Sequence, residues 1–304
     1  MTTCLELARL LATEQQWADD RFGAGKHISF FVHCQIVSDG CPVSGVDLVI
    51  VRFLGTHNAE SRNARLVSFV IDDTLAVDAG SLASELSFLE QEKIKAILLS
   101  HGHYDHIRGI PAFAFNNADH ATKVFATQQT LEILCSHLID GVIYPRFTER
   151  IPFLEKPALE LRALEPWKSE DIEGYRVLAI PVNHAIDTVG FEITSKDGKK
   201  VFYTGDTGPG LIALWEHLSP HLLIADVTFP NRFENVAKDS RHLCPETLKV
   251  ELVGFRRVKG YLPRVVLIHL SPKFEEEIRG EVQELAAELG LSIGIACEGD
   301  KLVI

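Results

Sequence analysis

Three histidines and one aspartate lie within six consecutive positions of this 304-residue chain. They are His101, His103, Asp105 and His106. Imidazole nitrogen suits zinc, iron and manganese, and an added carboxylate widens the choice to harder ions. His101 and His103 are two positions apart and can reach one ion, whereas Asp105 and His106 point elsewhere. The cluster therefore favours a metal-binding loop with room for two ions. The alternative is a polar surface loop that is rich in histidine by chance.

The segments on either side of this loop must hold it in place. The apolar run 96–99 predicts a buried strand, and the proline and aromatic residues after Gly109 predict that the chain turns into a helix. The histidines then lie in a loop at the carboxyl end of a strand, which is where α/β folds usually carry their chemistry.

Four later segments repeat this arrangement of an apolar strand followed by a polar residue. The strand-end residues are His184, Asp206, Asp226 and His269. Taken singly, such residues more often cap a helix or bond to the backbone than bind a metal. Their repetition favours a shared site at one edge of a sheet.

Residues 47–54, 66–71 and 75–77 are rich in β-branched side chains and are separated by polar turns, which predicts an antiparallel meander. Asp78 ends the meander. It is either a helix cap or turn residue, or an acceptor that orients a metal-binding histidine. A helix is predicted over 84–93.

Composition limits the class of protein. A hydrophobic fraction of 46% supports a packed core, and a net charge of −12 argues against a surface that grips long nucleic acid. This negative charge is still compatible with a small anionic substrate if metal ions supply positive charge at the site. The six cysteines form no Cys-x-x-Cys pair, which predicts reduced thiols. Without an apolar leader or a long apolar run, we expect a cytoplasmic protein with no membrane segment.

The chain is expected to have two parts. Residues 1–45 form an N-terminal extension with an amphipathic helix at about 3–20 and an irregular segment. Residues 46–304 form one catalytic domain, because no repeat, low-complexity tract or long linker interrupts them. The apolar face of the N-terminal helix is compatible with formation of a homodimer.

The motifs together resemble those of the metallo-β-lactamase superfamily. Asp78, the histidine loop, His184, the Gly-Asp-Thr-Gly segment 205–208 and His269 follow one another in that family's order. The resemblance implies an α/β fold, a four-layer αββα sandwich with a dinuclear metal site at one edge of the sheets. The ligands that it implies are His101, His103 and His184 for the first ion, Asp105, His106 and His269 for the second, and Asp206 bridging both.

Two divalent ions would lower the pKa of a bridging water, supply a hydroxide nucleophile and hold an anionic phosphate. Zinc is the expected metal, with manganese and iron as alternatives. Asp105 and His242 are the expected catalytic residues, with Asp78 orienting a ligand.

The segments 225–231 and 240–246 are similar to the phosphodiesterase branch of the superfamily, which includes ribonuclease Z and the class II cyclic nucleotide phosphodiesterases. There, a histidine at the position of His242 protonates the leaving oxygen or stabilises the phosphate. Alternatively, His242 packs near the start of a helix predicted at 245–254. The segment 137–145 and the proline after the Gly-Asp-Thr-Gly segment favour the cyclic nucleotide enzymes.

We therefore expect a metal-dependent phosphodiesterase that hydrolyses a 3′,5′-cyclic mononucleotide or a cyclic dinucleotide. One alternative is ribonuclease Z-like processing of transfer RNA 3′ ends, although long nucleic acid is not the expected partner. Thioester or lactone hydrolysis on the same scaffold and a non-catalytic metal or nucleotide sensor are further alternatives. His57, Arg62 and Asn63 fall in a loop that could face the site, and free surface positions are the favoured assignment.

Overall fold

The computed structural model describes residues 48–118, 120–150 and 156–304, all within the compact unit Gly45–Ile304. The predicted extension 1–45, with its helix and its apolar dimer face, lies outside the described residues. The boundary at residue 45 stays a prediction.

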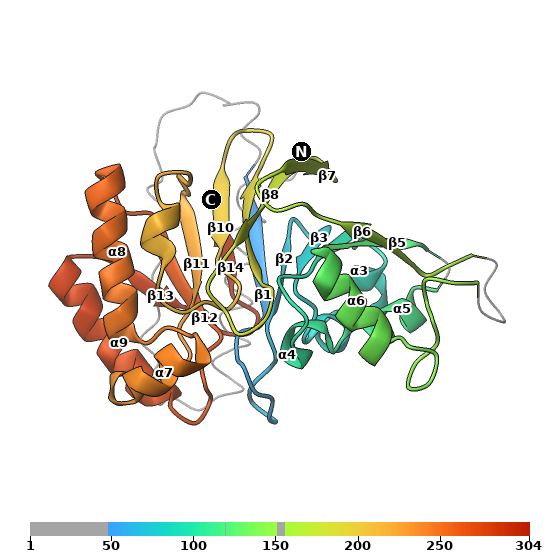
Figure 1. The fold of residues 1–304 in the computed structure, drawn as a ribbon, viewed down its shortest axis with the longest axis horizontal. Coiled ribbons are helices and arrows are strands. Elements are labelled where there is room, and N and C mark those ends of the chain that lie inside the picture. Colours follow the sequence, from blue (N-terminus) through green and yellow to red (C-terminus); the bar gives the residue numbers. More distant parts are fainter. Residues whose placement is uncertain (1–47, 119, 151–155) are drawn as a thin grey trace, which may run out of the picture. The chain divides into compact units, whose positions relative to one another are not determined.

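In the described part of the chain, two mixed sheets of seven strands each lie next to one another (Figure 1). Each sheet joins antiparallel strands on one side to parallel strands on the other. The first sheet has the spatial order β14 (Lys301–Val303), β1 (Ile50–Gly55), β2 (Ser68–Ile71), β3 (Leu75–Val77), β4 (Ala96–Leu98), β5 (Thr122–Ala126) and β6 (Leu159–Ala163). The second has the order β13 (Ile293–Ile295), β12 (Arg264–Ile268), β11 (Leu222–Asp226), β10 (Lys200–Tyr203), β9 (Val189–Thr194), β8 (Tyr175–Pro181) and β7 (Ser169–Ile172).

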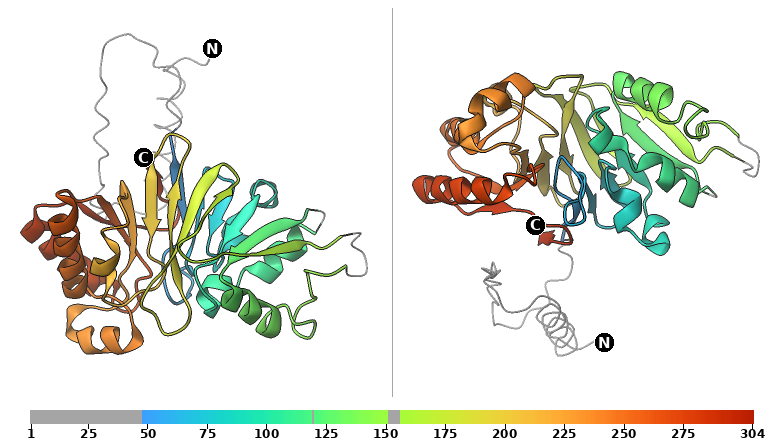
Figure 2. Two further views of the ribbon diagram at one scale, coloured as in Figure 1. Left: turned by 45° about the horizontal axis from the view of Figure 1, so that its top comes forward. Right: turned by 90° about the horizontal axis from the view of Figure 1, so that it is seen from below.

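Helices cover the outer face of each sheet, which confirms the predicted αββα sandwich (Figures 1 and 2). None of the described helices is long and apolar enough to cross a membrane. On the first sheet lie α2 (Leu82–Glu85), α3 (Phe88–Gln91), α4 (Tyr104–Ile107), α5 (Ile110–Asn116) and α6 (Gln128–His137). On the second lie α8 (Pro245–Lys259) and α9 (Glu275–Leu289), with α7 (Glu234–Ser240) and the 3-10 turns η1 (Leu211–Leu214) and η2 (Asn231–Phe233) in the connections.

The antiparallel meander predicted at the start of the domain is confirmed, because β2 pairs antiparallel with both β1 and β3. All four residues of β2 are buried, as expected for a strand that is covered on both faces. Between the sheets, Phe69 meets Tyr203 edge to face with ring centroids 5.2 Å apart. Burying such side chains stabilises the fold by about 1.5–3 kcal/mol each.

The helix predicted over 84–93 is wrong, because the chain forms two short helices there, α2 and α3. Leu86 between them is extended, with φ −103° and ψ 133°. The Glu90 carboxylate accepts a hydrogen bond from the Ser87 backbone N–H at 2.8 Å. Ser87 therefore begins a new helix instead of continuing the first, which is the usual effect of serine followed three positions later by glutamate.

Candidate metal centre

The histidine cluster follows β4, as the sequence predicts, but only His101 and His103 lie in a loop. Asp105 and His106 lie in the single turn of α4, which begins before the helix that is predicted after Gly109. Backbone contacts press this turn against the end of β3, where the Ala79 N–H donates to the His106 carbonyl at 2.7 Å. Gly109 permits the contact, because a Cβ there would lie 2.2 Å from the Ala79 carbonyl oxygen.

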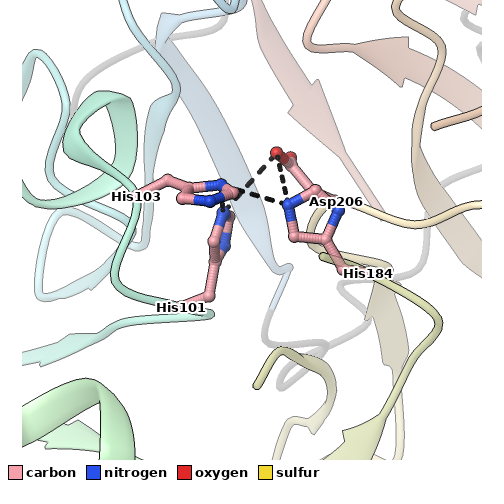
Figure 3. Close-up of side chains that lie close together, drawn as sticks. All are labelled: His101, His103, His184 and Asp206. Atoms are coloured by element: carbon pink, nitrogen blue, oxygen red, sulfur yellow. Dashed lines mark hydrogen bonds and ion pairs between the residues drawn. The ribbon is translucent and has the colours of Figure 1, made fainter. Parts of the chain in front are cut away.

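One group of ligand atoms comes from His101, His103, His184 and Asp206 (Figure 3). The His103 Nδ1 atom lies 3.0 Å from His101 Nε2 and 3.1 Å from His184 Nε2. The Asp206 Oδ2 atom lies 3.6 Å from His101 Nε2 and 3.8 Å from His184 Nε2. Three imidazoles and one carboxylate therefore converge on one point, although their residues come from three separate segments.

A second group comes from Asp105, His106, His269 and again Asp206. The His269 Nε2 atom lies 3.1 Å from Asp105 Oδ2 and 3.2 Å from Asp206 Oδ2. The His106 Nε2 atom lies 3.3 Å from the other Asp206 oxygen, Oδ1. Asp206 thus presents one carboxylate oxygen to each group of histidines, while its Oδ2 also faces His269.

Both groups fit divalent metal ions. His106 Nε2 and Asp206 Oδ1 are buried atoms for which the described residues supply no hydrogen-bond partner. In the first group, ring nitrogens face one another at hydrogen-bond distance, an arrangement in which an ion can replace a shared proton. Ligands at about 2.0–2.1 Å from a tetrahedral ion lie roughly 3.3 Å from one another, and the observed separations are close to this.

Burial and neighbouring charges shift the pKa values of the histidines in opposite directions in the two ligand groups. Burial lowers the pKa of His101, His103 and His184, and neighbouring histidines lower that of His101 further, so these rings are neutral and ready to bind a cation. In the second group, burial also opposes the charged form. Asp206 and its neighbouring carboxylates outweigh that effect, and they raise the pKa of His106 and bring that of His269 to about 10. Metal uptake there must release protons.

Asp78 is fully buried and orients the His106 ring. Its Oδ2 atom accepts from His106 Nδ1 at 2.8 Å and from the Tyr203 hydroxyl at 2.7 Å. The Ser100 N–H and hydroxyl donate to the same carboxylate at 2.8 and 2.9 Å. Of the two interpretations of Asp78, this geometry favours the acceptor, because Ser81 and not Asp78 is the N-cap of the next helix.

Beside the second group, His242 and Asp226 form a hydrogen-bonded pair, with His242 Nδ1 2.7 Å from Asp226 Oδ2. The His242 ring stacks on the His269 ring with centroids 5.1 Å apart and planes 14° apart. Its centroid also lies 5.0 Å from that of His184. His242 does not cap α8, since Cys244 is the N-cap, and it lies instead at the junction of the two groups.

Asp226 is the residue whose contribution the sequence interpretation missed. In the sequence it stands out only as one of the strand-end residues, with no metal-binding or catalytic role assigned to it. The structure shows that its carboxylate bonds to His242, to the Thr228 hydroxyl at 2.7 Å and to the Thr207 N–H at 3.1 Å. Its position at the end of β11, equivalent to that of Asp206 after β10, is the signal that could have found it.

The assignment of His57 to a free surface position is wrong. Its side chain is buried, and its ring nitrogens lie 2.7 Å from Glu298 and 3.3 Å from Glu275. Burial alone would lower the pKa of His57, but the two carboxylates raise it to about 9. The backbone of the preceding residue, Thr56, accepts the His269 N–H at 2.6 Å, so this region supports the second histidine group.

Comparisons with known proteins agree with this site. The profile of the Beta-lactamase superfamily domain matches residues 69–270. A 3′,5′-cyclic-nucleotide phosphodiesterase of Aliivibrio fischeri is 22% identical over 204 residues, which are 61% of this chain and 61% of that protein. A Ribonuclease Z of Methanocaldococcus jannaschii is 28% identical over 150 residues, 46% of this chain and 45% of that protein. The chain thus matches about half to three fifths of the length of these curated relatives.

Among solved structures, unliganded yeast PDE1 has a similar fold, with a TM-score of 0.73 at 16% identity, covering 84% of this chain and 99% of that one. The family profile covers most of the sandwich. It includes the histidine loop, Asp206, Asp226 and His269. Membership implies divalent metal ions, for which the two histidine groups are suited. The chain therefore belongs to the metallo-β-lactamase superfamily.

Proposed function

We propose that this protein is a metal-dependent phosphodiesterase that hydrolyses a cyclic nucleotide, either a 3′,5′-cyclic mononucleotide or a cyclic dinucleotide. The observation that carries the proposal is the pair of ligand groups that share Asp206, with the hydrogen-bonded His242–Asp226 pair next to both. A site that only senses a metal has no use for a proton donor held at the junction of two such groups.

The proposed ligands of the first ion are His101, His103 and His184, and those of the second are Asp105, His106 and His269, with Asp206 between them. Two divalent ions in these positions would supply a water of lowered pKa and positive charge against the phosphate. We expect zinc, because imidazole predominates, with manganese and iron as alternatives that the carboxylates also accommodate.

His242 is the proposed general acid. Asp226 accepts the Nδ1 proton of His242, which leaves Nε2 as the atom that can protonate the leaving oxygen as its bond to phosphorus breaks. Burial opposes the charge of Asp226, but His242 and His269 lower its pKa, so the carboxylate stays ionised and holds the His242 ring in one orientation. Asp105 likewise stays ionised beside His106 and His269, as an acceptor at the reaction centre.

The substrate class rests on two observations. The named relative in Aliivibrio fischeri acts on 3′,5′-cyclic nucleotides, and the net charge of −12 does not favour long RNA. Ribonuclease Z activity is the second candidate, because the relative in Methanocaldococcus jannaschii carries that name. Binding of transfer RNA would show a strong salt dependence that binding of a cyclic mononucleotide would not.

The test is hydrolysis of cyclic AMP, cyclic GMP, cyclic di-GMP, cyclic di-AMP and precursor transfer RNA by protein reloaded separately with zinc, manganese or iron. Asp206→Ala is the control, because it removes the carboxylate that both ligand groups share. Metal-dependent turnover of a cyclic nucleotide that the control loses supports the proposal. Cleavage of transfer RNA alone would establish the second candidate, and tight nucleotide binding without turnover would indicate a sensor.

A further inference from the structure

Arg241 lies at the rim of the candidate metal centre, directly before His242 in the chain. It ends α7 in the left-handed conformation, with φ 59° and ψ 53°. Its backbone carbonyl accepts a hydrogen bond from His184 Nδ1 at 3.1 Å, and its guanidinium donates to the carbonyl oxygen of His184. Arg241 therefore connects a proposed metal ligand to the proposed general acid.

The guanidinium keeps most of its hydrogen-bonding capacity. The side chain is exposed, and the described residues provide it with no carboxylate partner. Arg108 and Arg65 differ in this respect, since Arg108 pairs with Glu60 at 2.9 Å and Arg65 with Glu85 at 2.6 Å. Arginine presents five N–H donors in a planar fork that matches phosphate oxygens in pairs, so Arg241 has donors left for a ligand.

The charge of the centre requires a cation of this kind. The carboxylates of Asp78, Asp206 and Asp226 are buried at or behind the two histidine groups, and that of Asp105 is half-buried beside them. Two divalent ions would only balance these four charges. The whole chain adds a net charge of −12, which repels an anion as it approaches. A guanidinium at the rim gives the loaded site the positive charge that an anionic phosphodiester needs.

We propose that Arg241 is a substrate-binding residue that engages a non-bridging phosphate oxygen of the phosphodiester. This inference rests on the proposed function, and it specifies how the anionic group of the substrate is recognised. Removal of one charge-assisted contact to phosphate weakens binding by roughly 10- to 100-fold.

Binding of inorganic phosphate to the full-length, metal-loaded protein tests the inference without requiring turnover. Isothermal titration calorimetry compares the wild type with Arg241→Gln and Arg241→Lys, and metal content is measured for each. Both replacements have long unbranched side chains, so the left-handed backbone at this position is strained no more than by arginine. Arg257→Gln is the matched control, because Arg257 is exposed on α8 and pairs with no carboxylate among the described residues.

We expect Arg241→Gln to weaken phosphate binding about 10- to 100-fold with metal content unchanged, Arg241→Lys to weaken it less, and Arg257→Gln to leave it as in the wild type. Unchanged affinity in Arg241→Gln, or no phosphate binding by the wild type, would overturn the inference. Loss of metal from Arg241→Gln would overturn it in favour of a role confined to holding His184. Phosphate binding that depends on Arg241, in a protein that hydrolyses no phosphodiester, would count against the proposed function and not against this anion site.

Discussion

Replacement of Asp78 by asparagine should weaken binding of the second metal ion more than binding of the first. The Asp78 carboxylate accepts the Nδ1 proton of His106, so the proton that the ring gives up to a metal ion is the one on Nε2, which faces Asp206. The amide nitrogen of asparagine is a donor, so placing it toward His106 forces the imidazole proton onto Nε2. That proton blocks the atom that must bind the metal.

The magnitude follows from the contacts of Asp78. Four donor contacts from Ser100, His106 and Tyr203 reach this buried carboxylate. Loss of a partner that orients a ligand typically weakens metal binding by about 10- to 100-fold, which corresponds to roughly 1.4–2.8 kcal/mol. We expect the larger loss at the second ion, because Asp78 bonds directly to His106 and reaches the first group only through the Ser100 hydroxyl, which lies 3.0 Å from His101 Nδ1.

The assay is a titration of metal-free protein with zinc in competition with a chromophoric chelator, which resolves the two binding steps. Tyr203→Phe is the matched control, because it removes one donor to the same carboxylate at 2.7 Å without adding a donor. It should weaken the second step by less than about tenfold. Wild-type affinity for both ions in Asp78→Asn, or equal weakening of the two steps, would refute the reasoning.

Three further predictions concern catalysis and stability. His242→Ala should lower phosphodiester turnover by about 100- to 10,000-fold at constant metal content, and Asp226→Asn should lower it in the same direction, as measured by steady-state kinetics. Wild-type turnover in both would exclude the acid role. Because the pKa of His57 is raised to about 9, its contribution to stability is complete below about pH 6.5 and is lost as pH rises through 9. Urea unfolding should show this loss of about 3 kcal/mol in the wild type and not in His57→Gln. Gly109→Ala should lower the free energy of unfolding by about 1–3 kcal/mol, because its Cβ meets the Ala79 carbonyl at 2.2 Å, and an unchanged midpoint would contradict that clash.

The strand-end arrangement of the site could be predicted from the sequence because parallel strands bring their carboxyl ends to one edge. The strands β10, β11 and β12 are adjacent and parallel, so Asp206, Asp226 and His269 necessarily lie near one another. Local pattern also predicts the loop that follows β4, but not the single helical turn α4 that carries Asp105 and His106. These features depend on short apolar runs and on sheet geometry, both of which are visible in one sequence.

Other features depend on contacts between distant segments, which spacing does not reveal. The bond between Asp226 and His242 requires the fold of the intervening connection, and burial of His57 requires Glu275 and Glu298 from the end of the chain. The break between α2 and α3 is different, because the serine and glutamate that cause it are visible locally. In that segment the apolar spacing favours one continuous helix, but the capping interaction between Ser87 and Glu90 begins a second helix.

The most direct test of the central claim is hydrolysis of bis-para-nitrophenyl phosphate during stepwise addition of zinc, manganese or iron to metal-free protein. The account predicts that turnover rises as the second equivalent of metal binds, and that Asp206→Ala, which lacks the shared carboxylate, shows no such rise. Two bound ions per chain without hydrolysis under any of the three metals would contradict a dinuclear phosphodiesterase.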